Sequence, residues 1–216
     1  MEHFFNKPHM GENWFTFPQL YRSVVNRFPS GSHFVEIGSW KGMSAAFMAV
    51  EIINSNKDIK FDCIDIWAEE AYLHENTIID GKLVVQDVFG DELYNTFLKN
   101  IEPVRHAINP IRKDSVAAAA DYEDESLDFV FVDGDHSYEG VKRDIIAWLP
   151  KMKPNSVFAG HDYAWTPVIQ QAVEEIFGPG RFDDPWRNGC FLFEIKNGIP
   201  HHPSMEAPKT FTYSTG

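Results

Sequence analysis

The chain is poor in cysteine, in basic residues and in long apolar runs. Its two cysteines, Cys63 and Cys190, stand among apolar neighbours, so we expect buried free thiols in a reducing compartment rather than a disulfide framework. No apolar run approaches the roughly 20 residues of a membrane-spanning helix, and the first ten residues lack the layout of a signal peptide. These absences predict a cytoplasmic protein without a membrane partner.

Basic residues are outnumbered by acidic ones. The 216 residues include 19 Lys and Arg against 32 Asp and Glu, which gives a net charge of -13. A surface that follows phosphates needs the opposite sign, so we expect no nucleic-acid partner. Hydrophobic content of 44% and charged content of 24% are ordinary globular values. The length predicts one sizeable domain with a full core.

What the chain does contain is an alternation of strand and helix patterns. Helical apolar spacing covers 17–28, 43–55, 138–152 and 166–177, with a further helix near 91–100; strand patterns cover 33–38, 60–67, 128–134, 157–163 and 190–196. This order predicts an α/β fold: a Rossmann-like, doubly wound, mostly parallel sheet covered on both faces, in a single domain.

We divide the chain into three parts on the same evidence. Residues 1–30 form an N-terminal helical or lid segment, and 31–197 form the main domain, with a long connection over 68–112. Residues 198–216 are rich in Pro and His, and we expect a loosely packed or disordered tail.

Ligands of such sheets bind beyond the carboxyl ends of the strands, and the first of these ends reads VEIGSWKGMS. Gly38 and Gly42 bend the chain, and Ser44 lies near the helix N-terminus, whose free N–H groups suit a carboxylate. Trp40 stands where a dinucleotide motif needs its second glycine, which disfavours NAD or FAD. Glu36 suits the ammonium group of a smaller zwitterion. The alternative is a strand-to-helix turn without a ligand.

The second strand end, CIDIW, carries an acid at its tip. Asp65 is placed to accept hydrogen bonds from both hydroxyls of a ribose. Ile66 and Trp67 could flank an adenine ring by apolar and stacking contacts. Burial of Trp67 in the core is an equally good interpretation.

Two further strand ends carry carboxylates beside imidazoles. The apolar run DFVFV leads directly into Asp133, Asp135 and His136, and a later strand pattern contains His161 and Asp162. Asp133 and Asp162 should end neighbouring strands, where two carboxylates suit a hard divalent cation. Asp135 either orients His136 or caps the next helix, and we favour the cap.

Taken together, VEIGSWKGMS, the acid at Asp65, DFVFVDGDHSYEGV and AGHDY closely resemble class I S-adenosylmethionine-dependent methyltransferases. The resemblance is closest to the type 24 branch, akin to metal-dependent sugar and macrolide O-methyltransferases. It implies that a methionine moiety lies among Glu36, Gly38, Ser39 and Gly42. It also implies that the ribose lies on Asp65 and that Asp114 and Ser115 lie beside the adenine.

The resemblance also implies roles for the acidic edge. Asp133 and the adjacent pair His161 and Asp162 would hold a divalent metal, Mg²⁺ or Mn²⁺, and His136 would be the base that takes the acceptor proton. Relatives often carry Glu, Asp or Asn at the place of His161, and imidazole suits Mn²⁺, Zn²⁺ or iron better than Mg²⁺. An ordinary imidazole pKa of about 6.5 suits a base at neutral pH.

The implied reaction is O-methylation of a small hydroxylated acceptor, a sugar or secondary metabolite. Aromatic segments outside the shared core could bind that acceptor or form a dimer interface: Trp14, Phe15 and Phe17 as a lid, Tyr72 and His74 as a wall, and Trp186 and Arg187 at the rim. A metal-independent methyltransferase, a non-catalytic nucleoside-binding or scaffold protein, and other metal chemistry such as hydrolysis or hydroxylation stay open as alternatives.

Overall fold

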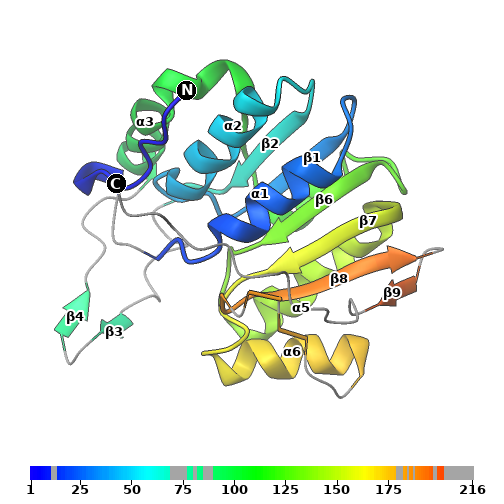
Figure 1. Cartoon of the computed structure of the whole chain (residues 1–216). Coiled ribbons are helices and arrows are strands. Elements are labelled where there is room, and N and C mark those ends of the chain that lie inside the picture. Colours follow the sequence, from blue (N-terminus) through cyan, green and yellow to red (C-terminus); the bar gives the residue numbers. More distant parts are fainter. Residues whose placement is uncertain are drawn as a thin grey trace.

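A seven-stranded sheet forms the centre of the molecule (Figure 1). The computed structural model describes residues 1–10, 14–68, 77–79, 82–84, 90–178, 182–183, 185–186, 188–196 and 199–201. The strand order is β5-β2-β1-β6-β7-β8-β9. The first five strands are parallel to one another, β8 pairs antiparallel with β7, and β9 pairs antiparallel with β8. The strands are β1 (His33–Ile37), β2 (Lys60–Asp65), β5 (Asn109–Arg112), β6 (Leu127–Val132), β7 (Met152–Gly160), β8 (Phe191–Lys196) and β9 (Ile199–His201). Strands β3 (Thr77–Ile79) and β4 (Lys82–Val84) form a separate antiparallel pair.

Helices cover both faces of the sheet, which confirms the predicted doubly wound α/β fold. One face carries α1 (Pro18–Arg27), α2 (Met43–Ser55) and α3 (Gly90–Asn100), and the other carries α4 (Ser115–Ala119), α5 (Tyr138–Trp148) and α6 (Pro167–Phe177). Short 3₁₀ turns occupy Pro8–Met10, Glu102–Ala107 and Leu149–Lys151. None of the helices in this described part of the chain is both long and apolar enough to cross a bilayer.

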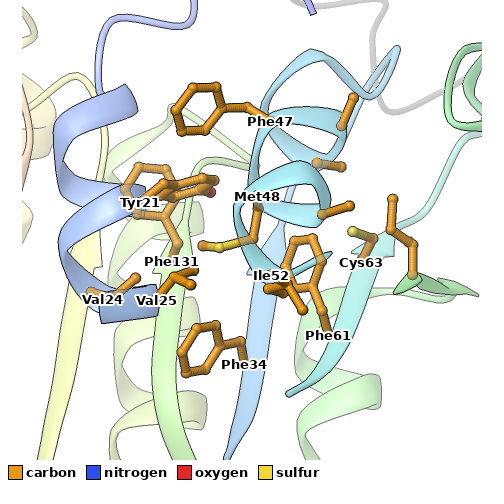
Figure 2. Packing of buried hydrophobic residues seen from close by; sticks show 14 of the residues in the cluster. Tyr21, Val24, Val25, Phe34, Phe47, Met48, Ile52, Phe61, Cys63 and Phe131 are labelled. Carbon is orange, nitrogen blue, oxygen red and sulfur yellow. The ribbon is translucent and has the colours of Figure 1, made fainter. Parts of the chain in front are cut away.

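The alternation of side chains along the strands produces two hydrophobic cores. In β6, Phe129 and Phe131 point into the core under α1 and α2, whereas Val130 and Val132 point into the core under α5 and α6. Figure 2 shows the first core, where Tyr21 of α1 lies beside Phe131. Both cysteines are buried and free, as predicted.

The structure corrects several element boundaries. Strand β5 falls in the connection where we predicted only a helix; its four residues include Pro110, which suits an edge strand. Residues 153–156, which lie between the predicted helix at 138–152 and the predicted strand at 157–163, are part of β7, whose pairing with β6 shifts register here. Ile199–His201 pair with β8, although we assigned them to a loosely packed tail; residues 202–216 lie outside the described residues.

Candidate active site

Hydrogen bonds beyond the strand ends bring the predicted site residues to one edge of the sheet. The Gly38 N–H donates to the Ile64 carbonyl at 2.8 Å, and the Asp133 N–H donates to the Ile37 carbonyl at 2.8 Å. The His161 N–H donates to the Val132 carbonyl at 3.0 Å. Because these bonds continue the parallel ladder, the ends of β2, β1, β6 and β7 lie side by side.

Gly38 and Gly42 are required by the loop after β1. Both have left-handed φ angles, +86° and +87°, which glycine adopts without a Cβ penalty. A Cβ on Gly38 would lie 2.0 Å from the backbone oxygen of Asp133, and one on Gly42 would lie 2.9 Å from Ile101. The glycine at position 38 therefore lets the backbone at the end of β1 touch the backbone at the end of β6. Gly42 precedes α2 without a side-chain cap, and Ser44 lies in the first turn of that helix.

Glu36 is a buried carboxyl with one oxygen engaged. The Tyr21 hydroxyl donates to its Oε2 at 2.6 Å. Its Oε1 and the Ser39 hydroxyl are buried and have no hydrogen-bond partner among the described residues. Burial raises the pKa of Glu36 to about 7, against the opposing effect of the nearby Tyr21, Ser39 and Ser44 hydroxyls. A buried, half-paired carboxyl of this kind suits a cationic group of a ligand.

Asp65 joins two loops at the end of β2. Its carboxylate accepts the Trp40 N–H at 2.8 Å and the Trp67 N–H at 2.9 Å, and both tryptophans have left-handed backbones. Each carboxylate oxygen has further lone pairs, so these bonds leave acceptor capacity for ribose hydroxyls. The acid predicted to bind ribose thus also shapes the loops on either side of it.

Trp67 does not offer a stacking surface. Its indole is fully buried against Tyr94 and Phe97, and its ring N–H donates to the Trp40 carbonyl. The prediction that Trp67 flanks the adenine is therefore wrong, and its alternative, burial in the core, is the one the structure supports. Ile66 is 40% exposed at the same edge.

Asp114 and Ser115 lie beside Asp65, because the Lys113 N–H donates to the Asp65 carbonyl at 3.0 Å. Asp114 is the N-cap of α4, where it accepts the Ala117 N–H, and it pairs with Arg143 at 3.4 Å. The Ser115 hydroxyl accepts the indole N–H of the buried Trp148. Both side chains therefore have structural partners at the position predicted for the adenine.

Two carboxylates and two imidazoles converge at the ends of β6 and β7. The His136 Nε2 lies 3.5 Å from Asp133 Oδ1 and 3.3 Å from Asp162 Oδ2. The His161 Nδ1 lies 3.6 Å from Asp133 Oδ1 and 3.3 Å from Asp162 Oδ1. A ligand atom from each of Asp133, His136 and Asp162 lies within 4.8 Å of the others. A small cavity beside this cluster is lined by Asp133, His136 and His161.

Asp162 reaches the cluster through an unusual backbone. Strand β7 ends at Gly160, before the predicted boundary at 163, and Asp162 follows with a left-handed φ of +58°. The Asp162 carbonyl accepts the N–H groups of Trp165 and Thr166, which hold the turn into α6. Such a conformation costs a non-glycine residue on the order of 1 kcal/mol and is concentrated at functional sites.

The carboxylates and imidazoles shift one another's pKa values. Burial favours neutral Asp133, but the facing His161 and His136 outweigh it and lower the Asp133 pKa. Burial and the Asp133 charge together raise the pKa of Asp162. Burial opposes charging of His161, but the two carboxylates outweigh it and raise the His161 pKa. Negative charge in this cluster is therefore incompletely balanced by the protein.

Asp135 lies just before the true helix cap. Its carboxylate accepts the Ser137 N–H at 2.8 Å, and the Ser137 hydroxyl accepts the Gly140 N–H as the N-cap of α5. The predicted capping by Asp135 is thus correct in region but wrong in residue: Ser137 is the cap, and Asp135 makes the turn that precedes it.

The N-terminal segment contributes contacts that the sequence did not predict. Trp14 stacks on Trp40 with ring centroids 4.9 Å apart, but Phe15 and Phe17 are buried rather than presented as a lid. Two polar contacts had no signal in the residue pattern: the Tyr21 hydroxyl bond to Glu36, and a bond between the Thr16 hydroxyl and His161. Tyr72, His74 and Arg187 lie outside the described residues.

Comparison with known proteins identifies the family. Residues 35–163, more than half of the chain, match the family described as "Methyltransferase domain". The chain belongs to this family. It is a class I S-adenosylmethionine-dependent methyltransferase. The matched span begins next to Glu36 and ends just after Asp162, so it contains every predicted cofactor and metal residue.

Relatives of this methyltransferase include uncharacterised proteins. The chain is 36% identical over 74 residues to protein y4gI of Sinorhizobium fredii and 26% identical over 210 residues to protein R132 of Acanthamoeba polyphaga mimivirus. The matched part is 8% of the first relative and 81% of the second.

Solved structures show the same fold. The O-methyltransferase NovP superposes with a TM-score of 0.60 at 17% identity, covering 84% of this chain and 80% of NovP. A protein described as a putative O-methyltransferase from Klebsiella pneumoniae gives 0.51 at 14% identity, covering 80% and 70%.

Proposed function

We propose that this methyltransferase transfers a methyl group to a hydroxyl oxygen of a sugar or secondary metabolite, assisted by a divalent cation. The observation that carries the proposal is the convergence of Asp133, Asp162 and His136 at the strand edge next to the cofactor loop. The shared fold of NovP, an O-methyltransferase by its title, supports it. We further propose that the enzyme works in the cytoplasm on a small-molecule acceptor.

The donor set fits a divalent cation. Ligand atoms on opposite sides of a small hard cation are about 4.2 Å apart, and slightly more for a larger one. The ligand atoms of Asp133, Asp162 and His136 lie within 4.8 Å of one another, and the His161 Nδ1 lies 3.3–3.6 Å from the same two carboxylates. The Asp133 carboxylate, whose pKa is lowered, and the Asp162 carboxylate, whose pKa is raised, lie next to each other. Asp133, Asp162 and His161 would hold the ion.

The cofactor loop fits S-adenosylmethionine. The Glu36 Oε1, which has no hydrogen-bond partner among the described residues, suits the ammonium group of the cofactor. The close backbone contact between Gly38 and Asp133 brings the cofactor loop next to the acidic edge. When bound, the cofactor supplies an electrophilic methyl group and the cation stabilises negative charge on the acceptor oxygen. Glu36 and Asp65 orient one reactant, and Asp133 and Asp162 fix the position of the other.

His136 is the group placed to take the acceptor proton. Its side chain is 40% exposed, whereas that of His161 is 6% exposed. The His136 Nε2 is buried beside the two carboxylates, so a substrate that arrives from solvent would meet the exposed part of this ring. The His136 imidazole would take the proton of the acceptor hydroxyl as its oxygen becomes methylated.

A metal-independent methyltransferase is the second candidate. The His136 Nε2 lies within 3.5 Å of both Asp133 and Asp162, an arrangement in which carboxylates could orient a base without a cation. Chelator treatment separates the two: the metal-assisted enzyme loses turnover and regains it with Mg²⁺ or Mn²⁺, whereas the metal-independent enzyme is unchanged.

The first experiment is calorimetric titration with S-adenosylhomocysteine, with and without Mg²⁺ or Mn²⁺, after chelator treatment. We expect micromolar binding and a separate metal heat that Asp162→Asn removes. Hydroxylated acceptors are then screened for methylation. Absence of metal binding and chelator-resistant turnover would contradict the metal-assisted mechanism.

Asp65→Ala separates the cofactor site from the acidic edge. The change removes the acceptor for ribose and releases the Trp40 and Trp67 loops. We expect S-adenosylhomocysteine affinity to fall by about tenfold or more, while metal binding persists. Loss of metal binding with unchanged S-adenosylhomocysteine affinity would mean that Asp65 belongs to the metal site and not to the cofactor site.

A further inference from the structure

The environment of His161 determines which of its ring nitrogens carries a proton. The Thr16 hydroxyl lies 2.7 Å from the Asn188 carbonyl oxygen and 2.9 Å from His161 Nε2. A carbonyl oxygen only accepts, so the single Thr16 proton is donated to Asn188. Thr16 then has only lone pairs to offer His161. The ring nitrogen Nε2 must therefore be the donor. Nδ1 has no bond to Thr16, so it is the nitrogen that would ligate a cation between the carboxylates, giving up any proton that it shares with them.

The other ring nitrogen, Nδ1, faces the acidic cluster. Nδ1 lies 3.3 Å from Asp162 Oδ1 and 3.6 Å from Asp133 Oδ1. The ring is held in this orientation by Phe17, at a centroid distance of 4.8 Å, and by the edge of Trp165, at 5.4 Å. With 6% of the side chain exposed, the imidazole cannot turn without breaking the Thr16 bond and this packing.

We propose that Thr16 is a positioning residue that fixes His161 as a nitrogen ligand, so that the site prefers a transition-metal ion such as Mn²⁺ or Co²⁺ to Mg²⁺. A ligating imidazole typically donates its other N–H to an oxygen, which sets the tautomer and the ring direction. The Thr16–Asn188 pair supplies that oxygen from two segments far apart in the sequence. Imidazole nitrogen favours transition metals, whereas carboxylate, carbonyl and water oxygens suit Mg²⁺.

The test compares Co²⁺ and Mg²⁺ titrations of the chelator-treated full chain. His161→Asn is the matched control, because it keeps a neutral side chain but offers an oxygen near the place of Nδ1. We expect the ratio of Co²⁺ to Mg²⁺ affinity to fall by about tenfold or more in both Thr16→Val and His161→Asn. Thr16→Ser, which keeps the hydroxyl, should retain the ratio and the visible absorption of bound Co²⁺.

A second measurement does not depend on any variant. In wild-type protein labelled with ¹⁵N-histidine, the ring nitrogen shifts of His161 should show a proton on Nε2, whether or not Nδ1 also carries one, and Mn²⁺ should broaden the signals of this ring. A proton on Nδ1 alone would overturn the proposal, as would an unchanged affinity ratio in folded Thr16→Val.

This inference rests on the proposed metal-assisted function, and the outcomes separate the two. If wild-type protein binds Co²⁺ and Mg²⁺ but Thr16→Val leaves the ratio unchanged, only the role of Thr16 is overturned. If wild-type protein binds S-adenosylhomocysteine but neither metal, the metal-assisted function and the inference are overturned together.

Discussion

Two clusters in this protein pair aspartate with histidine, one near each edge of the sheet. Near the amino-terminal edge, Asp62 accepts hydrogen bonds from His33 and Tyr122 at 2.7 Å and from Asn109 at 2.9 Å. At the carboxyl edge, the distances from Asp133 and Asp162 to the two imidazoles are 3.3–3.6 Å. The same residue types are thus fully bonded in one cluster and loosely assembled in the other.

The difference separates a structural cluster from a functional one. Around Asp62, donors match acceptors, and the hydrogen bonds outweigh burial and lower the Asp62 pKa to about 2. At the carboxyl edge the cluster holds two carboxylates, and burial with the Asp133 charge raises the Asp162 pKa. An arrangement that is complete within the chain stabilises the fold, whereas an incomplete one gains from a ligand.

The largest expected effect is on catalysis by Asp162→Asn. Asparagine tolerates the left-handed backbone of this position, so the turn is kept while a charge that we propose binds metal is lost. We expect turnover to fall by at least about a hundredfold, with S-adenosylhomocysteine affinity within severalfold and no loss of stability, because the repulsion from Asp133 is removed. Enzyme assay, calorimetry and urea unfolding check the three parts. Strong destabilisation of Asp162→Asn would mean that Asp162, like Asp62, stabilises the fold.

Asp62→Asn should show the opposite pattern. An amide at this position replaces one acceptor by a donor that faces other donors, and breaking a buried charged cluster costs about 3 kcal/mol of unfolding free energy. Turnover per folded molecule should be unchanged. Urea unfolding and an activity assay on the same samples test this, and a variant as stable as wild type but inactive would reverse the assignment.

Acid should remove the contribution of Asp62. Its pKa is lowered from 3.8 to about 2 in the folded protein, so its stabilisation is fully present above pH 3.8 and is lost as pH falls through about 2. The difference in unfolding free energy between wild type and Asp62→Asn should therefore shrink by about 2 kcal/mol over this range. Urea unfolding at several pH values measures it; a difference that does not change with pH would contradict the pKa shift.

The smallest expected effect is a release of protons from Glu36 on ligand binding. The Tyr21 hydroxyl donates to one oxygen of this carboxyl, and the other oxygen has no hydrogen-bond partner among the described residues. Its pKa is raised from 4.5 to about 7, so the carboxyl of the ligand-free protein is neutral below pH 7. Its contribution to folding stability is fully present below pH 4.5 and is lost as pH rises through 7. An ammonium-bearing ligand favours the ionised form, so S-adenosylhomocysteine should release up to about one proton at pH 6 and fewer at higher pH. Calorimetry in buffers of different ionisation enthalpy measures the release. Glu36→Gln should abolish it, and equal release from both proteins would locate the proton elsewhere.

The sequence predicted the strand ends well because buried parallel strands produce continuous apolar runs that stop at polar residues. Asp65, Asp133 and Asp162 all follow such runs, and the topology then brings them to one edge. Strand β5 was missed because four half-exposed residues including Pro110 leave no apolar run. Trp67 lies in the core and Thr16 contacts His161 because of the way distant loops pack together. Neither residue type nor sequence spacing predicts such packing.

The contact at Gly38 limits how this enzyme can diversify. Any side chain there would collide with the Asp133 backbone, so a substitution at Gly38 would also displace Asp133, a proposed metal ligand. Trp14, by contrast, stacks on Trp40 from a separate segment and is 41% exposed. Evolution can therefore alter Trp14 by itself, whereas Gly38 and the end of β6 must change together or not at all.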